Sequence, residues 1–145
     1  MSISPAPLPE PVRNGTQALR VMFLATGHPL EPETLAFFLD DAGVGGLITV
    51  VSGTTEADSV LHVAEYMARA AEGVSHAACL VVATVRPAGG LLPGDAERWR
   101  QLDRITDEHG IQLLEWFVIG PDGAHCPREL AGDDERWSPL ARPRP

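Results

Sequence analysis

The segment Leu80–Gly120, LVVATVRPAGGLLPGDAERWRQLDRITDEHGIQLLEWFVIG, determines the fold that the rest of the chain must complete. It begins with a continuous apolar run and passes through a loop rich in Pro and Gly. A charged helical pattern follows, and a second apolar run ends the segment. Apolar strands without alternation indicate a sheet that is covered on both faces. The segment therefore predicts a strand–helix–strand unit of an α/β domain.

Working outward, four apolar runs are predicted to be buried strands, each followed by a turn-forming residue. They are residues 19–24, 47–51, 78–83 and 113–119, followed by Gly27, Gly53, Pro87 and Gly120. Apolar residues at helical spacing predict helices over 60–71 and 96–109. We expect Asp95 to be the N-cap of the second helix and Gly110 to end it.

The segment 32–43 is compatible with two structures. Its apolar residues fall on one helical face, Pro32 suits a first turn and Gly43 suits the position after a helix. The unbroken run 35–39 also fits a strand. The local signals favour the helix, which makes strands and helices alternate strictly. That alternation predicts an α/β fold, arranged as a three-layer α-β-α sandwich with a central sheet of at least four strands.

The 145 residues are predicted to form one α/β domain over residues 16–130. Residues 1–15 are rich in proline and are expected to be a disordered leader. Residues 131–145 are expected to be a charged, proline-containing tail.

The chain is acidic, with a net charge of −9. This charge argues against binding to nucleic acid, which requires a cationic surface. No apolar stretch is long enough to cross a bilayer and no secretory signal is present, so we expect a cytoplasmic protein without a membrane partner. Two cysteines, Cys79 and Cys126, do not form a disulfide framework. No motif calls for a cofactor, and the chain can be a homo-oligomer.

An ordered set of short motifs follows residue 36: Leu39-Asp40, Gly53-Thr54, a helix with Glu65, Pro87-Ala88-Gly89, and Leu114-Glu115-Trp116 with Gly120. This order resembles the RadC-like branch of the JAB/MPN metalloprotease fold. Cys126 with Arg128-Glu129 resembles the terminal segment of that family. The resemblance covers about ninety residues. It implies an α/β domain whose metal ion activates water for hydrolysis.

The metal ligands of that family do not appear in this chain. Thr84 and Arg86 stand where the resemblance places two histidines. A hydroxyl is a poor ligand, and a guanidinium stays protonated. The carboxylate position matches Asp95 or Glu97, and the proton-handling glutamate would fall near Pro32 or Glu33. The resemblance therefore implies a degenerate domain without a metal site, for which metal-dependent hydrolysis is not expected.

Polar residues follow the predicted strands, and parallel strands would bring them to one edge of the sheet. His28, Ser52, Thr54, Thr55 and Arg86 are the candidates for binding an anion there, together with Asp95. Ordinary turns also favour Ser, Thr and Gly, so these residues can equally be turn formers. Trp116 is a candidate partner-binding residue if it stands at an exposed sheet edge, and a core residue if it packs.

Two hypotheses about function follow. The first is a non-catalytic, JAB-like binding or regulatory module that lacks the metal site. The second is a small α/β enzyme or sensor that binds an anionic metabolite at the carboxyl ends of the strands, with Arg86 as the charged anchor. The sequence favours the first and identifies neither a protein partner nor a small-molecule ligand.

Overall fold

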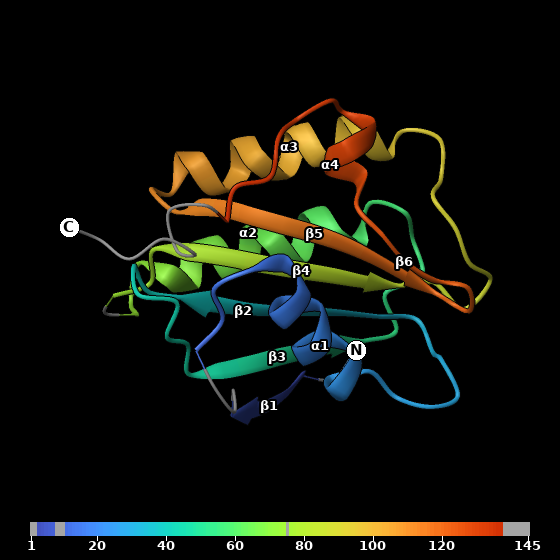
Figure 1. The fold of residues 1–145 in the computed structure, drawn as a ribbon, viewed down its shortest axis with the longest axis horizontal. Helices are drawn as coiled ribbons and strands as arrows, with labels where there is room; N and C mark the ends of the chain where they lie inside the picture. Colours follow the sequence, from blue (N-terminus) through green and yellow to red (C-terminus); the bar gives the residue numbers. More distant parts are fainter. Residues whose placement is uncertain (1–2, 8–10, 75, 138–145) are drawn as a thin grey trace.

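A mixed six-stranded sheet forms the centre of the molecule, with strand order β1-β3-β2-β4-β5-β6 (Figure 1). The computed structural model describes residues 3–7, 11–74 and 76–137. The elements are β1 (Ile3–Pro7), α1 (Gly15–Ala25), β2 (Glu33–Leu39), β3 (Leu47–Ser52), α2 (Ser59–Ala71), β4 (Cys79–Val85), α3 (Asp95–Glu108), β5 (Gln112–Gly120), β6 (Gly123–His125) and α4 (Pro127–Leu130). The predicted α/β class and a sheet of at least four strands are confirmed.

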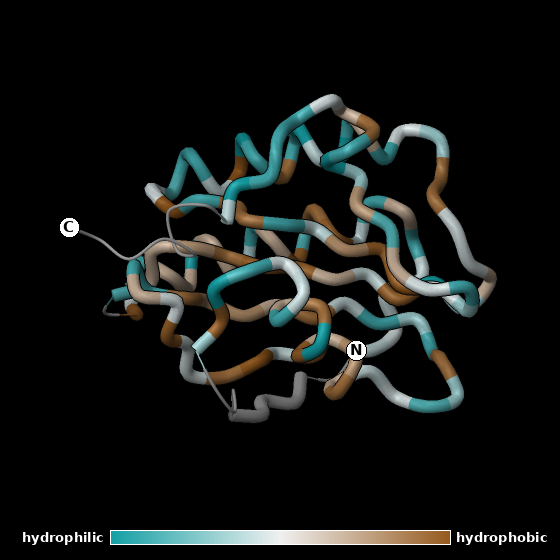
Figure 2. The backbone as a smooth tube through the Cα atoms, viewed as in Figure 1, coloured by the Kyte–Doolittle hydropathy of each residue, from teal (hydrophilic) through white to brown (hydrophobic). Residues whose placement is uncertain are grey.

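Apolar side chains fill both faces of the sheet. On one face, α2 and α3 pack against alternate residues of β4 and β5, with Trp99 and Leu102 of α3 fully buried. On the other face, α1 packs against the intervening residues of the same strands through Ala18, Val21 and Met22. Figure 2 shows hydrophobic residues along the central strands, whereas α3 is hydrophilic over most of its length. Because helices pack against both faces of the sheet, the side chains on both sides of the central strands are mostly apolar, and the strands appear in the sequence as continuous apolar runs.

The strands predicted over 47–51, 78–83 and 113–119 correspond to β3, β4 and β5, and the helices predicted over 60–71 and 96–109 to α2 and α3. The strand predicted over 19–24 is wrong, because these residues belong to α1. Asn14 begins that helix, since its side chain accepts a hydrogen bond from the backbone N–H of Gln17 at 2.8 Å. Ala18, Val21 and Met22 then form the buried helical stripe.

The helix favoured over 32–43 is also wrong, because Glu33–Leu39 is the strand β2. β2 lies between β3 and β4 and pairs antiparallel with both. Its residues are buried on both faces, so they show no alternation that would distinguish them from a helix. The strict alternation of strands and helices is lost as a result. The three-layer arrangement stays a prediction, since α1 is the single helix described on its face.

The ordered structure reaches beyond the predicted range 16–130. Residues 3–7, predicted to belong to a disordered leader, form β1 and pair with β3. Trp137, predicted to lie in a tail, is 1% exposed and belongs to the core on the α1 face. Residues 1–2, 8–10 and 138–145 lie outside the described residues. None of the helices in the described part of the chain has the length and apolarity needed to span a membrane.

Candidate functional site

Three strands end at the same edge of the sheet. β3 and β4 are both antiparallel to β2, and β5 is parallel to β4, so β3, β4 and β5 run in one direction. The three predicted strands that the structure contains thus run parallel, whereas β1, β2 and β6 run the other way. The carboxyl ends of β3 and β4 nevertheless bring Thr54, Thr55 and Arg86 along one pocket. Open α/β sheets commonly bind ligands at such an edge.

A buried ion pair lies beneath this edge. Arg86 donates two hydrogen bonds to Asp95, from Nη1 to Oδ2 at 2.7 Å and from Nη2 to Oδ1 at 3.0 Å. The side chain of Asp95 is 0% exposed and that of Arg86 is 11% exposed. A bidentate pair between a guanidinium and a carboxylate has both the strength and the geometric selectivity of two parallel charged hydrogen bonds. The pair fixes the loop after β4 to the start of α3.

Two further donors complete the environment of Asp95. The backbone N–H of Leu92 donates to Oδ2 at 2.7 Å, and Arg98 Nη1 donates to Oδ1 at 3.0 Å. Burial by itself raises the pKa of this carboxyl. The hydrogen bonds from Arg86, Leu92 and Arg98, together with the charge of Arg86, outweigh burial and hold the pKa of Asp95 below its usual value. Asp95 is therefore a carboxylate fully engaged by donors.

The prediction that Asp95 is the N-cap of α3 is wrong. Gly94 is the N-cap, in the left-handed conformation with φ 88°, and Asp95 is the first helical residue. Gly94 suits this position because it has no Cβ. The carboxylate of Asp95 turns toward Arg86 instead of the free N–H groups of its own first turn.

Trp116 is fully buried, with 0% exposure, so it is not available to anchor a partner. Its Nε1–H donates to the hydroxyl of Thr84 at 2.9 Å, and the guanidinium carbon of Arg86 lies 5.9 Å from the centroid of its ring. The candidate partner-binding role of Trp116 therefore does not fit the structure, and the packing alternative does. Both Thr84 and Arg86 contact Trp116, which places them on the same face of the sheet.

The pocket above the ion pair has a volume of about 220 Å³. Thr54, Thr55 and Glu56 from the loop after β3 form one wall, and Thr84, Arg86 and the loop 87–89 form the other. Thr54 is 5% exposed, and its hydroxyl bonds to that of Thr34 at 2.9 Å. The polar part of the lining therefore consists of hydroxyls, one guanidinium and one carboxylate, and the other lining residues are apolar, proline or glycine.

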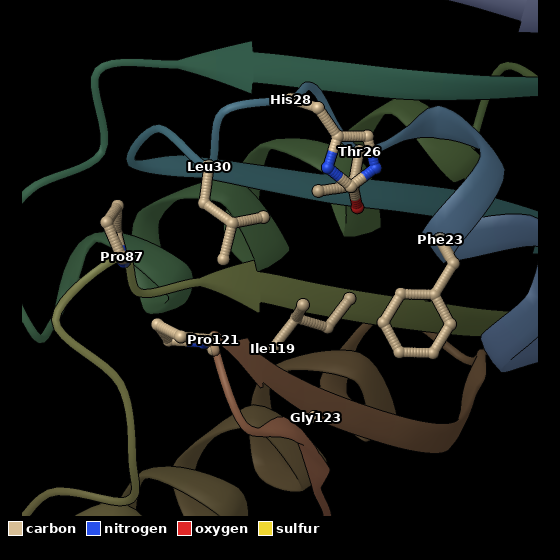
Figure 3. Close-up of a pocket in the computed structure, with 9 residues that line it drawn as sticks. Phe23, Thr26, His28, Leu30, Pro87, Ile119, Pro121 and Gly123 are labelled. Carbon is tan, nitrogen blue, oxygen red and sulfur yellow. The ribbon is translucent and has the colours of Figure 1, made fainter.

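Two of the predicted site residues lie elsewhere. His28 lines a separate, larger pocket (Figure 3), in the loop that enters β2. Ser52 ends β3 opposite Glu33 and lines neither pocket. The sequence reasoning thus grouped residues that the structure distributes over two faces of the sheet.

Glu33 does not face the Thr84–Arg86 pocket. The hydroxyl of the next residue, Thr34, bonds to Thr54 on the pocket side, and successive strand residues point to opposite faces. The Glu33 carboxylate accepts a hydrogen bond from the N–H of Gly27 at 3.2 Å on the α1 side. The residue on the pocket side at the start of this strand is Pro32, which has no acid–base chemistry.

The sequence reasoning did not single out the role of Gly120, which keeps two loops together. A Cβ on Gly120 would lie 2.9 Å from the Cα of Gly89, closer than side-chain carbons approach backbone. The loop 86–90 therefore packs directly on the end of β5. The sequence pattern that could have indicated this contact is the pair Gly89-Gly90 together with Gly120 at the end of the next strand.

The surroundings of Cys126 disfavour the thiolate form, which is the nucleophilic one. Burial, and then the negative charges of Glu115 and Glu129, raise the pKa of its thiol to about 12. Glu115 itself is 2% exposed and accepts a hydrogen bond from Arg128 Nε at 2.9 Å. Burial raises the pKa of Glu115 even though Arg128 opposes that effect. This second buried ion pair joins α4 to β5.

Within residues 3–7, 11–74 and 76–137, no group of three His, Cys, Asp or Glu side chains is arranged to hold a metal ion. No protein-family model matches the chain, and no curated protein matches its sequence.

Proposed function

We propose that the chain is a non-catalytic binding or regulatory module of the RadC-like JAB type, in which the Arg86–Asp95 ion pair stands in place of a metal centre. The observation that carries the proposal is the bidentate contact between these side chains. Arg86 matches one of the histidines of the resembled family, and Asp95 is the one of the two carboxylate candidates, Asp95 and Glu97, that bonds to it. A permanently protonated guanidinium supplies the positive charge that a metal ion would supply.

The order of the strands and helices supports the resemblance to this family. The family has a strand where this chain has β2, so the strand at Glu33–Leu39 fits it better than the helix expected from the sequence. Thr84 and Arg86 lie at the end of β4, on the same face, and Asp95 opens the following helix. The hydroxyl of Thr84 accepts a hydrogen bond from Trp116, so this side chain already has a structural partner on the pocket face.

The proposal predicts that two substitutions create a metal site. In the double variant Thr84→His and Arg86→His, Asp95 loses its bidentate contact with Arg86, keeps the hydrogen bond from Arg98, and has two imidazoles beside it. These three groups match the ligand set of an open catalytic zinc site. We expect this variant to bind one zinc ion in a calorimetric titration, and we expect no stoichiometric zinc binding to the wild type.

The triple variant that adds Asp95→Asn is the matched control, and its zinc affinity should fall by about tenfold or more. Circular dichroism checks that each variant is folded. Tight stoichiometric zinc binding by the wild type contradicts a metal-free centre. A folded double variant that binds no zinc contradicts the JAB-like arrangement.

A second candidate function is the binding of a small anionic metabolite in the 220 Å³ pocket. Arg86 and the hydroxyls of Thr54 and Thr55, which line this pocket, favour it. The engagement of Arg86 by Asp95 weakens it, because the carboxylate already neutralises the guanidinium. The first proposal therefore has the stronger support.

For the second candidate we expect inorganic phosphate, tested as the anion, to raise the melting temperature. The substitution Thr55→Val should remove most of that shift, because it deletes an exposed hydroxyl at the pocket. Thr16→Val, an exposed position on α1, is the control. Equal thermal shifts in both variants would exclude anion binding at this pocket.

A further inference from the structure

A second pocket, of about 530 Å³, opens on the α1 face of the sheet. Its volume falls within the range of small-molecule sites. Figure 3 shows the side chains of Phe23, Leu30, Ile119 and Pro121 arranged around an open centre, with His28 and Thr26 on one side. The lining is thus mostly apolar with a few polar groups, which is the composition typical of a binding pocket.

The pocket lies at the carboxyl-terminal end of α1. The hydroxyl and the backbone N–H of Thr26 both donate to the carbonyl of Met22, at 2.7 and 3.0 Å. The carbonyls that follow in the last turn have no partner within the helix. Helix carboxyl ends carry a partial negative charge, and no basic residue lies in the last turn of α1. This end of the pocket therefore favours a positive group.

Two negatively charged residues near the pocket, Glu33 and Asp122, also favour a positive group over a negative one. The Glu33 carboxylate is 8% exposed and lies behind the turn 26–28, where it accepts from the N–H of Gly27. Asp122 is exposed and lies between Pro121 and Gly123, which line the pocket. None of the nine described residues that line the pocket is Asp, Glu, Lys or Arg, and His28 is the one histidine among them. An anion would thus meet the carboxyl end of α1 without a lysine or arginine among the lining residues.

From this geometry we propose that the pocket binds a small protonated amine carried on an apolar ring. The ring lies among Phe23, Pro87 and Pro121, and the ammonium group faces the end of α1. Aromatic faces attract cations, and Phe23 is 41% exposed at the pocket wall. The hydroxyl of Thr26 retains lone pairs that can accept from the amine. The site does not depend on the proposed function, because Thr84, Arg86 and Asp95 do not line it.

The test uses two probes that share one ring system and differ in charge, followed by amide chemical shifts in a ¹⁵N-labelled sample. Tryptamine should shift the amides of Thr26, His28, Gly120 and Gly123. Indole-3-propionate, which carries a carboxylate on the same ring and the same two-carbon chain, should bind about tenfold more weakly or worse.

Phe23→Ala should weaken tryptamine binding by about tenfold, because it removes the aromatic wall. Leu24→Ala is the matched control: it lies on the same helical turn, is 74% exposed and does not line the pocket. Its affinity should match that of the wild type. Equal affinities for the two probes, or no shifts at these amides with millimolar tryptamine, would overturn the proposal. So would an equal loss of affinity in both variants.

Discussion

Asp95→Ala is expected to lower the free energy of unfolding by about 3–5 kcal/mol near neutral pH. The substitution leaves the guanidinium of Arg86, only 11% exposed, without its bidentate partner. It also removes the acceptor for the N–H of Leu92 and one acceptor for Arg98. Breaking a buried pair from one side is costly because the remaining charge stays out of water. Urea denaturation of the wild type and the variant measures the difference.

Asp58→Ala is the matched control, because Asp58 also bonds to Arg98 but is 65% exposed. Its effect should be about 0–1 kcal/mol. The pH dependence provides a second check. The folded-state pKa of Asp95 lies below its unfolded value, so its contribution is complete above the unfolded pKa and is lost as the pH falls through the folded pKa. The difference between wild type and variant should narrow over that range, and a constant difference contradicts the ionic explanation.

Arg128→Met is expected to cost a similar amount, about 3–5 kcal/mol at neutral pH. Arg128 is the ion-pair partner of Glu115, a carboxylate with 3% side-chain exposure on β5. Arg128 also donates to the carbonyl of Asp133 at 2.8 Å, so the turn after α4 loses a contact as well. Chemical denaturation of the variant measures the loss.

The free energy of unfolding of Arg128→Met should depend on pH in a different way from that of Asp95→Ala. Burial already raises the pKa of Glu115 above its unfolded value, and removal of Arg128 raises it further. Protonation then favours the folded state, so the variant should gain stability as the pH falls from neutrality toward the unfolded pKa. The double variant Arg128→Met with Glu115→Leu should recover much of the loss, since it leaves no buried charge. A double variant as unstable as Arg128→Met would show that the loss comes from packing.

The sequence was sufficient to predict a helix or strand where its pattern fits only one of the two. The helix α2 has apolar residues at strict helical spacing, and the strands β4 and β5 are continuous apolar runs beside glycine or proline. Two of the errors concern short apolar segments. Residues 19–24 form a helix because Asn14 caps it, and Glu33–Leu39 forms a strand because β3 and β4 offer it partners on both sides. Long-range pairing of this kind is not encoded in local periodicity.

The sequence predicted some of the residues that lie together at the site, but not which of their side chains bond to one another. Thr54, Thr55 and Arg86 were grouped correctly in space, because each follows a strand of the same direction. The pairing of Arg86 with Asp95 could not be foreseen, since an aspartate before a helix normally caps that helix. Trp116 could not be assigned to surface or core until the order of the strands placed α3 over it.

The positive charge beside Asp95 belongs to the side chain of Arg86 and differs in its origin from the charge of a bound metal ion. A metal ion must be acquired from solution and can be withdrawn by a chelator or exchanged for a competing ion. A guanidinium is synthesised with the polypeptide and remains bonded to it. The positive charge at this corner of the molecule is therefore a covalent part of the chain.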